Sequence, residues 1–283
     1  MKIITGGVTA PIGFRAAGMY CGIKKKQKKQ LDLALLVSEQ EGPVAGVFTT
    51  NQVVAAPVVL DRLHLKKGIG RAILVNSGNA NACTGPDGMR VAKEMAQLVA
   101  TALGSAPHTI FIGSTGVIGQ PLPIDCIKNA VPSLLARVTR RGGNEAAQAI
   151  MTTDLKPKQV AVRARLGGRM VTVGGMAKGS GMIHPNMATM LGYICTDACI
   201  ANPILQQMAR YVADHSFNCI TVDGDTSTND ALILMATGRA GHPEVTQFDS
   251  EDYLKLQEAI TDVARDLAQM IVRDGEGATK FIT

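Results

Sequence analysis

Residues 178–197 read KGSGMIHPNMATMLGYICTD and join a turn of small residues to an apolar segment. Gly179, Gly181 and Pro185 favour a turn with an unusual, exposed backbone. The residues that follow, MLGYICTD, are apolar and partly β-branched or aromatic, which predicts a buried strand with Thr189 at its first position. A loop of small and polar residues therefore presents a threonine at the start of a rigid element.

A threonine in this position can act as a nucleophile. Its hydroxyl needs a base near neutral pH, and the nearest base is its own α-amine once the preceding peptide bond is cut. A free α-amine titrates near a pH of about 8, so it can take and return a proton. The same hydroxyl can attack the carbonyl of Ala188 and form an ester that water opens. The residues equally fit a plain surface loop before a strand, since Gly, Ser, Pro and Asn mark loops of every kind.

Seven further segments, spread over the whole chain, point the same way. They are GGVTAPIGFRAAG (6–18), VAGVFTTNQVVAAPV (44–58), NSGNANACTG (76–85), STGVIGQPLP (114–123), MTTDLKPK (151–158), TVDGDTSTND (221–230) and RDGEGATKF (273–281). Together with KGSGMIHPNMATMLGYICTDA they resemble, in order, segments of the ornithine acetyltransferase family, also called bifunctional glutamate N-acetyltransferases. Motifs that follow the family order along the whole chain are far more specific than any single motif.

The resemblance implies an architecture and a processing event. The fold would be α/β, layered in the α+β sense, with stacked β-sheets between helical layers as in the N-terminal-nucleophile hydrolases. Self-cleavage would give an α chain, residues 1–188, and a β chain, residues 189–283, that begins with the nucleophile. Family members continue beyond RDGEGATKF, so we expect the C-terminal part of the β chain to be missing here. A last strand over 273–281 would then be an unpaired edge, which predicts poor solubility or inactivity.

The resemblance also assigns roles at the proposed cleavage site and beside it. It implies cleavage between Ala188 and Thr189, with Thr189 as the nucleophile, and an oxyanion hole formed by the Thr115 hydroxyl and the Gly116 backbone N–H. Attack on a carbonyl builds a negative oxygen, and each preorganised donor that meets it is worth about 3 to 4 kcal/mol. Thr115 could instead only cap a turn.

Three more positions are implied to bind the substrate: a threonine of MTTD, Lys178 and Glu276. Thr152 fits the family spacing better, with Thr153 as the near alternative. A cationic Lys178 suits a substrate carboxylate and Glu276 suits an ammonium group, so together they would recognise both ends of an amino acid. Taken alone, Lys178 would be expected in solvent and Glu276, between two glycines, in a turn.

The implied activity is acetyl transfer in arginine biosynthesis. Thr189 would take the acetyl group of N2-acetyl-L-ornithine as an ester, and L-glutamate would then accept it. The cycle needs no cofactor, although the resemblance allows acetyl-CoA as an additional donor. It also implies that α and β chains of one precursor assemble as a heterotetramer or larger. Two alternatives stay open: a related self-processing aminopeptidase or amidase, and an inactive chain that serves as a binding or assembly module.

Composition favours a cytoplasmic enzyme. With 283 residues, 46% apolar and 18% charged, the chain can bury a sizeable core. No apolar run reaches the roughly 18 residues of a membrane span, and the start lacks the order of a signal peptide, so no membrane partner is expected. The six cysteines form no CxxC pair, which favours reduced core thiols and no metal site. They are Cys21, Cys83, Cys126, Cys195, Cys199 and Cys219.

Three other patterns imitate binding sites. The net charge of +6 is concentrated in the lysine-rich run 24–29, but only 4% of the residues are aromatic, which leaves little on which bases could stack. We therefore expect a solvated loop there and no nucleic-acid partner. Gly113, Gly116 and Gly119 resemble a dinucleotide-binding turn, yet two prolines follow where that turn requires a helix. The Asp223-to-Asp230 cluster lacks the spaced ligands of a calcium loop and predicts a structural polar turn.

Periodicity predicts alternating helices and short strands. Apolar spacing predicts helices over 86–103, from Asn202-Pro203 onward, with Asn202 at the cap, and from Ser250 to about Ile271. Residues 159–175 should form a hairpin that turns at Gly167-Gly168. Further strands are expected at 31–37, 44–49, 71–76, 109–113, 189–196 and 219–223.

Overall fold

The computed structural model describes residues 1–24, 30–183 and 190–282, so the predicted cleavage site Ala188–Thr189 and most of the lysine run lie outside the described residues. The strands are β1 (Lys2–Ile4), β2 (Phe14–Met19), β3 (Leu33–Phe48), β4 (Ile69–Asn79), β5 (Ile110–Val117), β6 (Lys158–Leu166), β7 (Arg169–Lys178), β8 (Leu191–Thr196) and β9 (Ala231–Ala236). The helices are α1 (Ala56–Leu65), α2 (Gly85–Leu103), α3 (Ile124–Ala136), α4 (Gly143–Ala149), α5 (Asn202–Asp214) and α6 (Glu251–Arg273).

The described strands form one hydrogen-bonded path in the order β1-β6-β7-β8-β9-β3-β4-β5, and β2 pairs with β3. The long strand β3 belongs to two sheets. Residues 33–38 of β3 pair with β2, and residues 33–37 and 42–43 pair with β4 on the other side, whereas residues 44–48 pair with β9. The register of the β3–β4 pairing shifts between Val37 and Gly42, shortly before β3 passes from one sheet to the other.

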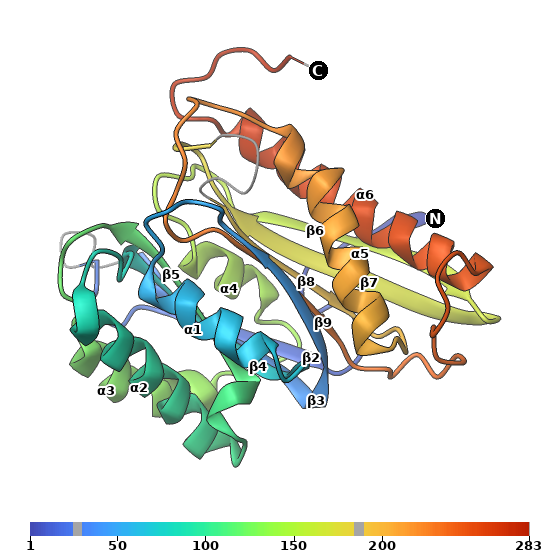
Figure 1. Cartoon of the computed structure of the whole chain (residues 1–283), viewed down its shortest axis with the longest axis horizontal. Coiled ribbons are helices and arrows are strands. Elements are labelled where there is room, and N and C mark those ends of the chain that lie inside the picture. Colours follow the sequence, from blue (N-terminus) through green and yellow to red (C-terminus); the bar gives the residue numbers. More distant parts are fainter. Residues whose placement is uncertain (25–29, 184–189, 283) are drawn as a thin grey trace.

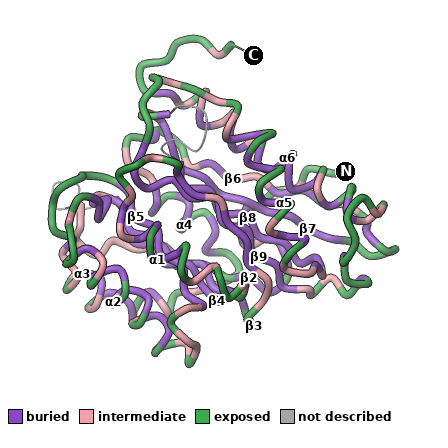
Figure 2. The backbone as a smooth tube through the Cα atoms, in the orientation of Figure 1, coloured by how far each residue is buried: buried purple, intermediate pink, exposed green. Residues whose placement is uncertain are grey.

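The two sheets stack face to face. Alternate side chains of β8 and β9, such as Tyr193 and Ile233, pack in one cluster with Leu36, Ile73 and Phe111 of the other sheet. The residues between them point to the outer faces, because side chains alternate along a strand. Because both faces of these strands are covered, their sequences are apolar runs without polar alternation. Figure 2 shows these strands as buried.

Helices cover both outer faces. The apolar sides of α5 and α6 pack on the sheet of β6 to β9, and those of α2 and α3 pack on the sheet of β4 and β5 (Figure 1). The α/β fold of stacked sheets between helical layers is therefore confirmed. The predicted inward positions of α6, from Leu256 to Ile271, are fully buried, and Ser250 caps the helix by accepting from the Tyr253 N–H.

Most predicted elements are confirmed, with shifted ends. Helix α2 ends at Gly104, which adopts the left-handed conformation expected of a C-terminal glycine (φ 64°). The hairpin β6–β7 turns at Gly167-Gly168. The strands predicted at 31–37 and 44–49 are parts of the single strand β3. Helices α1, α3 and α4 and strands β1, β2 and β9 were not predicted.

Three predictions were wrong. Residues 219–223 are not a strand, because the Val222 and Gly224 N–H groups both donate to the Ile183 carbonyl and curl the segment around it. Residues 273–281 are not a strand either, since α6 continues to Arg273 and Gly277 then adopts a turn conformation (φ 73°). Ala201 rather than Asn202 precedes α5 as its cap, and the Asn202 amide donates to the carbonyls of Val44 and Gly68.

The cysteines are free, as predicted, but not all of them lie in the core. Cys195 is buried, while Cys83 and Cys219 are exposed. Among the described residues, none of the helices has the length and apolar character that a membrane crossing requires.

Candidate active site

A cavity of about 570 Å³ opens where β4, β5 and β7 end, a size typical of small-molecule sites. The described residues predicted for the site, Thr115, Gly116, Lys178, Glu276 and both Thr152 and Thr153, all line it. They come from four separate stretches of the chain. The fold thus gathers the predicted oxyanion-hole and substrate residues around one space, while the predicted nucleophile Thr189 lies outside the described residues.

The end of β5 supplies Thr115 and Gly116. Gly116 has φ 132°, and a Cβ there would lie 2.4 Å from the Gly78 carbonyl carbon of the neighbouring strand β4, so only glycine fits. The Thr115 side chain is 7% exposed, and its Oγ1 lies 3.3 Å from the Lys178 Nζ. Since an ammonium group only donates, Thr115 accepts this bond and keeps its own proton for another acceptor. The pair can therefore present a polarised O–H donor to the cavity.

Lys178 ends β7 and is only 3% exposed, contrary to the solvent position that its residue type alone predicts. Burial lowers the pKa of Lys178. The nearby Asp154 and Asp230 oppose that shift, whereas Lys158 lowers the pKa of Lys178 further. A buried ammonium with a lowered pKa binds a carboxylate strongly, because water competes poorly for either charge.

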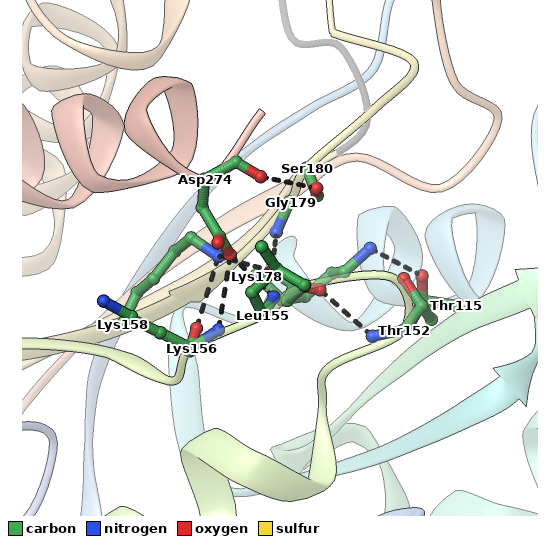
Figure 3. Close-up of polar contacts among 10 residues, drawn as sticks. Thr115, Thr152, Leu155, Lys156, Lys158, Lys178, Gly179, Ser180 and Asp274 are labelled. Atoms are coloured by element: carbon green, nitrogen blue, oxygen red, sulfur yellow. Dashed lines mark hydrogen bonds and ion pairs between the residues drawn. The ribbon is translucent and has the colours of Figure 1, made fainter. Parts of the chain in front are cut away.

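Asp154 links three residues that are labelled in Figure 3, Thr152, Lys158 and Gly179. Its carboxylate accepts from the Gly179 N–H at 2.7 Å, the Thr152 N–H at 3.0 Å and the Lys158 Nζ at 2.7 Å. Burial would raise the pKa of Asp154, but Lys178 and Lys158 outweigh burial and lower it. The MTTD segment is thereby fixed to the end of β7, and Thr152 is placed beside Lys178.

Asp274 fixes the segment that carries Glu276 to the neighbouring strands by hydrogen bonds. Its carboxylate accepts from the buried Lys158 Nζ at 2.6 Å, and its carbonyl accepts from the Ser180 hydroxyl at 2.6 Å. The Glu276 N–H in turn donates to the Ser180 carbonyl at 2.8 Å. A Cβ on Gly181 would lie 2.8 Å from the Glu276 Oε2, so the glycine leaves room for that carboxylate at the cavity.

Sequence reasoning missed Lys24. Instead of lying in a solvated loop, Lys24 lines the cavity, and its ammonium donates to the carbonyls of Leu31 at 3.1 Å and Met151 at 2.7 Å. The buried Asp32 organises this loop by accepting four consecutive backbone N–H groups, from Cys21 to Lys24. The signal in the sequence that could have indicated a structured loop at Lys24 was Asp32, a charged residue inside the apolar run LDLALLV.

Acidic side chains line another part of the wall. Asp223 accepts from the N–H groups of Met182 and Ile183, and Asp225 and Glu276 also face the cavity. The polar turn predicted here is confirmed for Asp223. Within the described ranges, no group of three or more His, Cys, Asp or Glu side chains is arranged to hold a metal ion. The cavity can thus receive carboxylate and ammonium groups of one small molecule.

Comparison with known proteins places this geometry in a family. The model of the ArgJ family matches residues 15–283. The chain belongs to the ArgJ family. Over 282 residues it is 52% identical to the arginine biosynthesis bifunctional protein ArgJ of Symbiobacterium thermophilum, covering 100% of this chain and 70% of that protein. Across the similar ArgJ proteins the chain spans 66% to 70% of their length.

Solved structures agree with the family and the fold. The ornithine acetyltransferase of Mycobacterium tuberculosis, solved in complex with ornithine, is 44% identical, with a TM-score of 0.60 over 65% of this chain and 97% of that chain. An aminopeptidase of Ochrobactrum anthropi, described as a variant of the Ntn hydrolase fold, is 13% identical, with a TM-score of 0.58 over 98% of this chain and 88% of that chain. At that identity the second likeness supports the fold alone.

Proposed function

We propose that this chain is an acetyltransferase of arginine biosynthesis that moves the acetyl group of N2-acetyl-L-ornithine to L-glutamate. The observation that carries the proposal is the cavity, which is lined by a donor pair at Thr115 and Gly116 and by the side chains of Lys178 and Glu276. An N-acetylated amino acid offers matching groups: a carbonyl oxygen, a carboxylate and, in ornithine, a side-chain ammonium. The names of the similar ArgJ proteins support a role in arginine biosynthesis, and the mycobacterial structure is named as an ornithine acetyltransferase in complex with ornithine.

Thr189 is the proposed nucleophile. Leu191, the first residue of β8, pairs with Lys178, which lines the cavity. The residues that directly follow Thr189 therefore lie next to the cavity wall. The Thr189 hydroxyl would attack the acetyl carbonyl while its proton passes to the Thr189 α-amine. Thr115 and Gly116 would stabilise the oxyanion. The amide C–N bond then breaks, the proton goes to the leaving nitrogen, and ornithine departs from an acetyl ester on Thr189.

The second half-reaction reverses these roles. The neutral α-amine of glutamate attacks the ester carbonyl, the Thr189 oxygen leaves and regains its proton, and N-acetylglutamate departs. Lys178 binds the carboxylate in both halves. Acetyl-CoA could acylate the same threonine by the same attack, with the thiol as leaving group, which would make the enzyme bifunctional. The proposed chemistry uses only the chain's own residues and needs no cofactor.

A free α-amine on Thr189 requires self-processing. The hydroxyl would attack the Ala188 carbonyl, the peptide C–N bond would break, and water would open the resulting ester to leave an Ala188 carboxylate. We propose that this cleavage gives an α chain, 1–188, and a β chain, 189–283. We also propose that the two chains assemble as a heterotetramer or larger, which a sedimentation measurement would test.

The test is the release of ornithine from N-acetylornithine with and without glutamate. Acetyl transfer predicts that glutamate accelerates steady-state ornithine release and that N-acetylglutamate appears in equal amount. A self-processing amidase would release ornithine and acetate at a rate that glutamate does not change. No ornithine under either condition would favour the binding or assembly module and contradict the proposed activity.

A further inference from the structure

Two cationic side chains face the cavity without a carboxylate partner. Lys24 and Lys178 both line it, and among the described residues no acidic side chain forms an ion pair with either ammonium group. The fully buried Lys158 shows the contrast, because its ammonium contacts Asp154 at 2.7 Å and Asp274 at 2.6 Å. A cation with a structural role is thus neutralised within the chain, whereas the charges of Lys24 and Lys178 are available to a ligand.

One N–H of the Lys24 ammonium remains for such a ligand. An ammonium group has three donors, and two of them are used by the carbonyls of Leu31 at 3.1 Å and Met151 at 2.7 Å. The carboxylate of Asp32 is occupied by the backbone N–H groups of residues 21–24. Two carbonyls therefore hold the Lys24 side chain in place, and its remaining donor is left for the cavity that Lys24 lines.

The two ammonium groups act on each other. Burial is the main cause that lowers the pKa of Lys24; Asp32 and Asp154 oppose that shift, and Lys178 lowers the pKa of Lys24 further. Like charges at one cavity repel each other. A ligand that brings two carboxylates relieves this repulsion better than a ligand that brings one.

The two amino acids of the proposed reaction differ in charge. N2-acetyl-L-ornithine carries one carboxylate and a side-chain ammonium, whereas L-glutamate carries two carboxylates. Lys178 suits the α-carboxylate that both share, and Glu276 suits the ornithine ammonium but repels the second carboxylate of glutamate. Binding of the acceptor therefore calls for a second cation at the cavity.

We propose that Lys24 determines the specificity for the acceptor: its remaining N–H binds the side-chain carboxylate of glutamate, while Lys178 binds the α-carboxylate. The inference rests on the proposed function, because glutamate is the second substrate of that reaction. Glutamate then pairs each cation with one carboxylate through charge-assisted hydrogen bonds. An acceptor with a neutral side chain leaves the Lys24 charge unpaired, so the enzyme should discriminate against it.

Glutamine is the matched acceptor, because a neutral amide of nearly the same shape replaces the side-chain carboxylate. Formation of the N-acetylated product from each acceptor, at saturating N-acetylornithine, gives the ratio of kcat/KM for glutamate to kcat/KM for glutamine. Wild type should prefer glutamate about 10- to 100-fold, the effect of one charge-assisted hydrogen bond. Lys24→Gln removes the charge but keeps a donor for the Met151 carbonyl, and it should lower this ratio about tenfold or more.

Two control variants accompany Lys24→Gln. Lys24→Arg keeps a cation and should keep the preference for glutamate. Lys67→Gln removes the charge of an exposed lysine and should leave the ratio unchanged. If thermal unfolding shows that Lys24→Gln does not fold, Lys24→Met takes its place and should lower the ratio by at least as much.

The ratio separates recognition of the acceptor from support of the fold. Loss of the bond to Met151 can misalign Thr152, but this would lower kcat/KM for both acceptors alike and leave the ratio unchanged. An unchanged ratio in a folded variant without the Lys24 charge, or a wild-type ratio near one, would overturn the inference, and the proposed function would stand because N-acetylglutamate is still formed. A wild-type chain that acetylates neither acceptor would contradict the proposed function, and the inference would fall with it.

Discussion

Replacing Thr115 by valine removes one hydroxyl and keeps the side-chain shape. The hydroxyl accepts from Lys178 at 3.3 Å, so its own proton is free to stabilise the oxyanion. Because Thr115 is only 7% exposed, water cannot readily replace the lost donor. Loss of one oxyanion donor costs about 3 to 4 kcal/mol in the transition state, so kcat should fall roughly 10²- to 10³-fold.

The assay is steady-state ornithine release at saturating glutamate, with kcat and KM determined separately. Thr115→Ser retains the hydroxyl and should keep kcat within about tenfold of wild type. Thermal unfolding of both variants checks the fold, since Lys178 loses an acceptor in Thr115→Val at a cost of about 1 to 3 kcal/mol. The reasoning is refuted if Thr115→Val keeps kcat within threefold, or if Thr115→Ser loses as much activity as Thr115→Val.

Three further predictions address the other walls of the site and its stability. Glu276→Gln should raise KM for N-acetylornithine about tenfold or more, because it removes a charge facing the cavity; unchanged KM would remove Glu276 from the site. Lys24→Met should lower kcat/KM about tenfold, because it removes the hydrogen bond to the Met151 carbonyl that holds the chain just before Thr152. The control variant Lys67→Met changes an exposed lysine and should leave kcat/KM unchanged. Equal effects of the two substitutions on kcat/KM would contradict this prediction. Burial raises the pKa of Asp230 to about 8, so between pH of about 4 and 8 the native state binds more protons than the unfolded state, and the free energy of unfolding falls as pH rises. Urea unfolding at pH 5 and pH 8 should show a smaller difference for Asp230→Asn than for wild type, and an equal difference would contradict the burial argument.

Local patterns predicted the elements whose signals are local. The apolar spacing of α6, its Ser250 cap and the Gly104 end of α2 depend on residues within a few turns, and all are confirmed. The residues 219–223 misled the prediction, because their β-branched side chains favour a strand while tertiary hydrogen bonds to Ile183 impose a turn. Local patterns also could not predict that two expected strands form the single strand β3, because β3 is stabilised by pairing with strands far away in the sequence.

The site residues were found through motif resemblance, and their environment was not. Nothing in the sequence near Lys178 indicates that it is buried or that it bonds to Thr115, 63 residues away. The network of Asp154, Lys158 and Asp274 joins the MTTD segment to the end of α6, and Lys24 reaches Met151 across 127 residues. Such contacts depend on how distant segments pack in the folded chain, which spacing along the sequence cannot reveal.

The proposed nucleophile is tested most directly by the intact mass of the purified chain, before and after incubation with N-acetylornithine, beside a Thr189→Ala variant. The account predicts two fragments separated between Ala188 and Thr189, with one acetyl group added to the fragment that begins at Thr189, and an uncleaved, unacetylated variant. An uncleaved wild-type chain, or an acetyl group on any other residue, would contradict it.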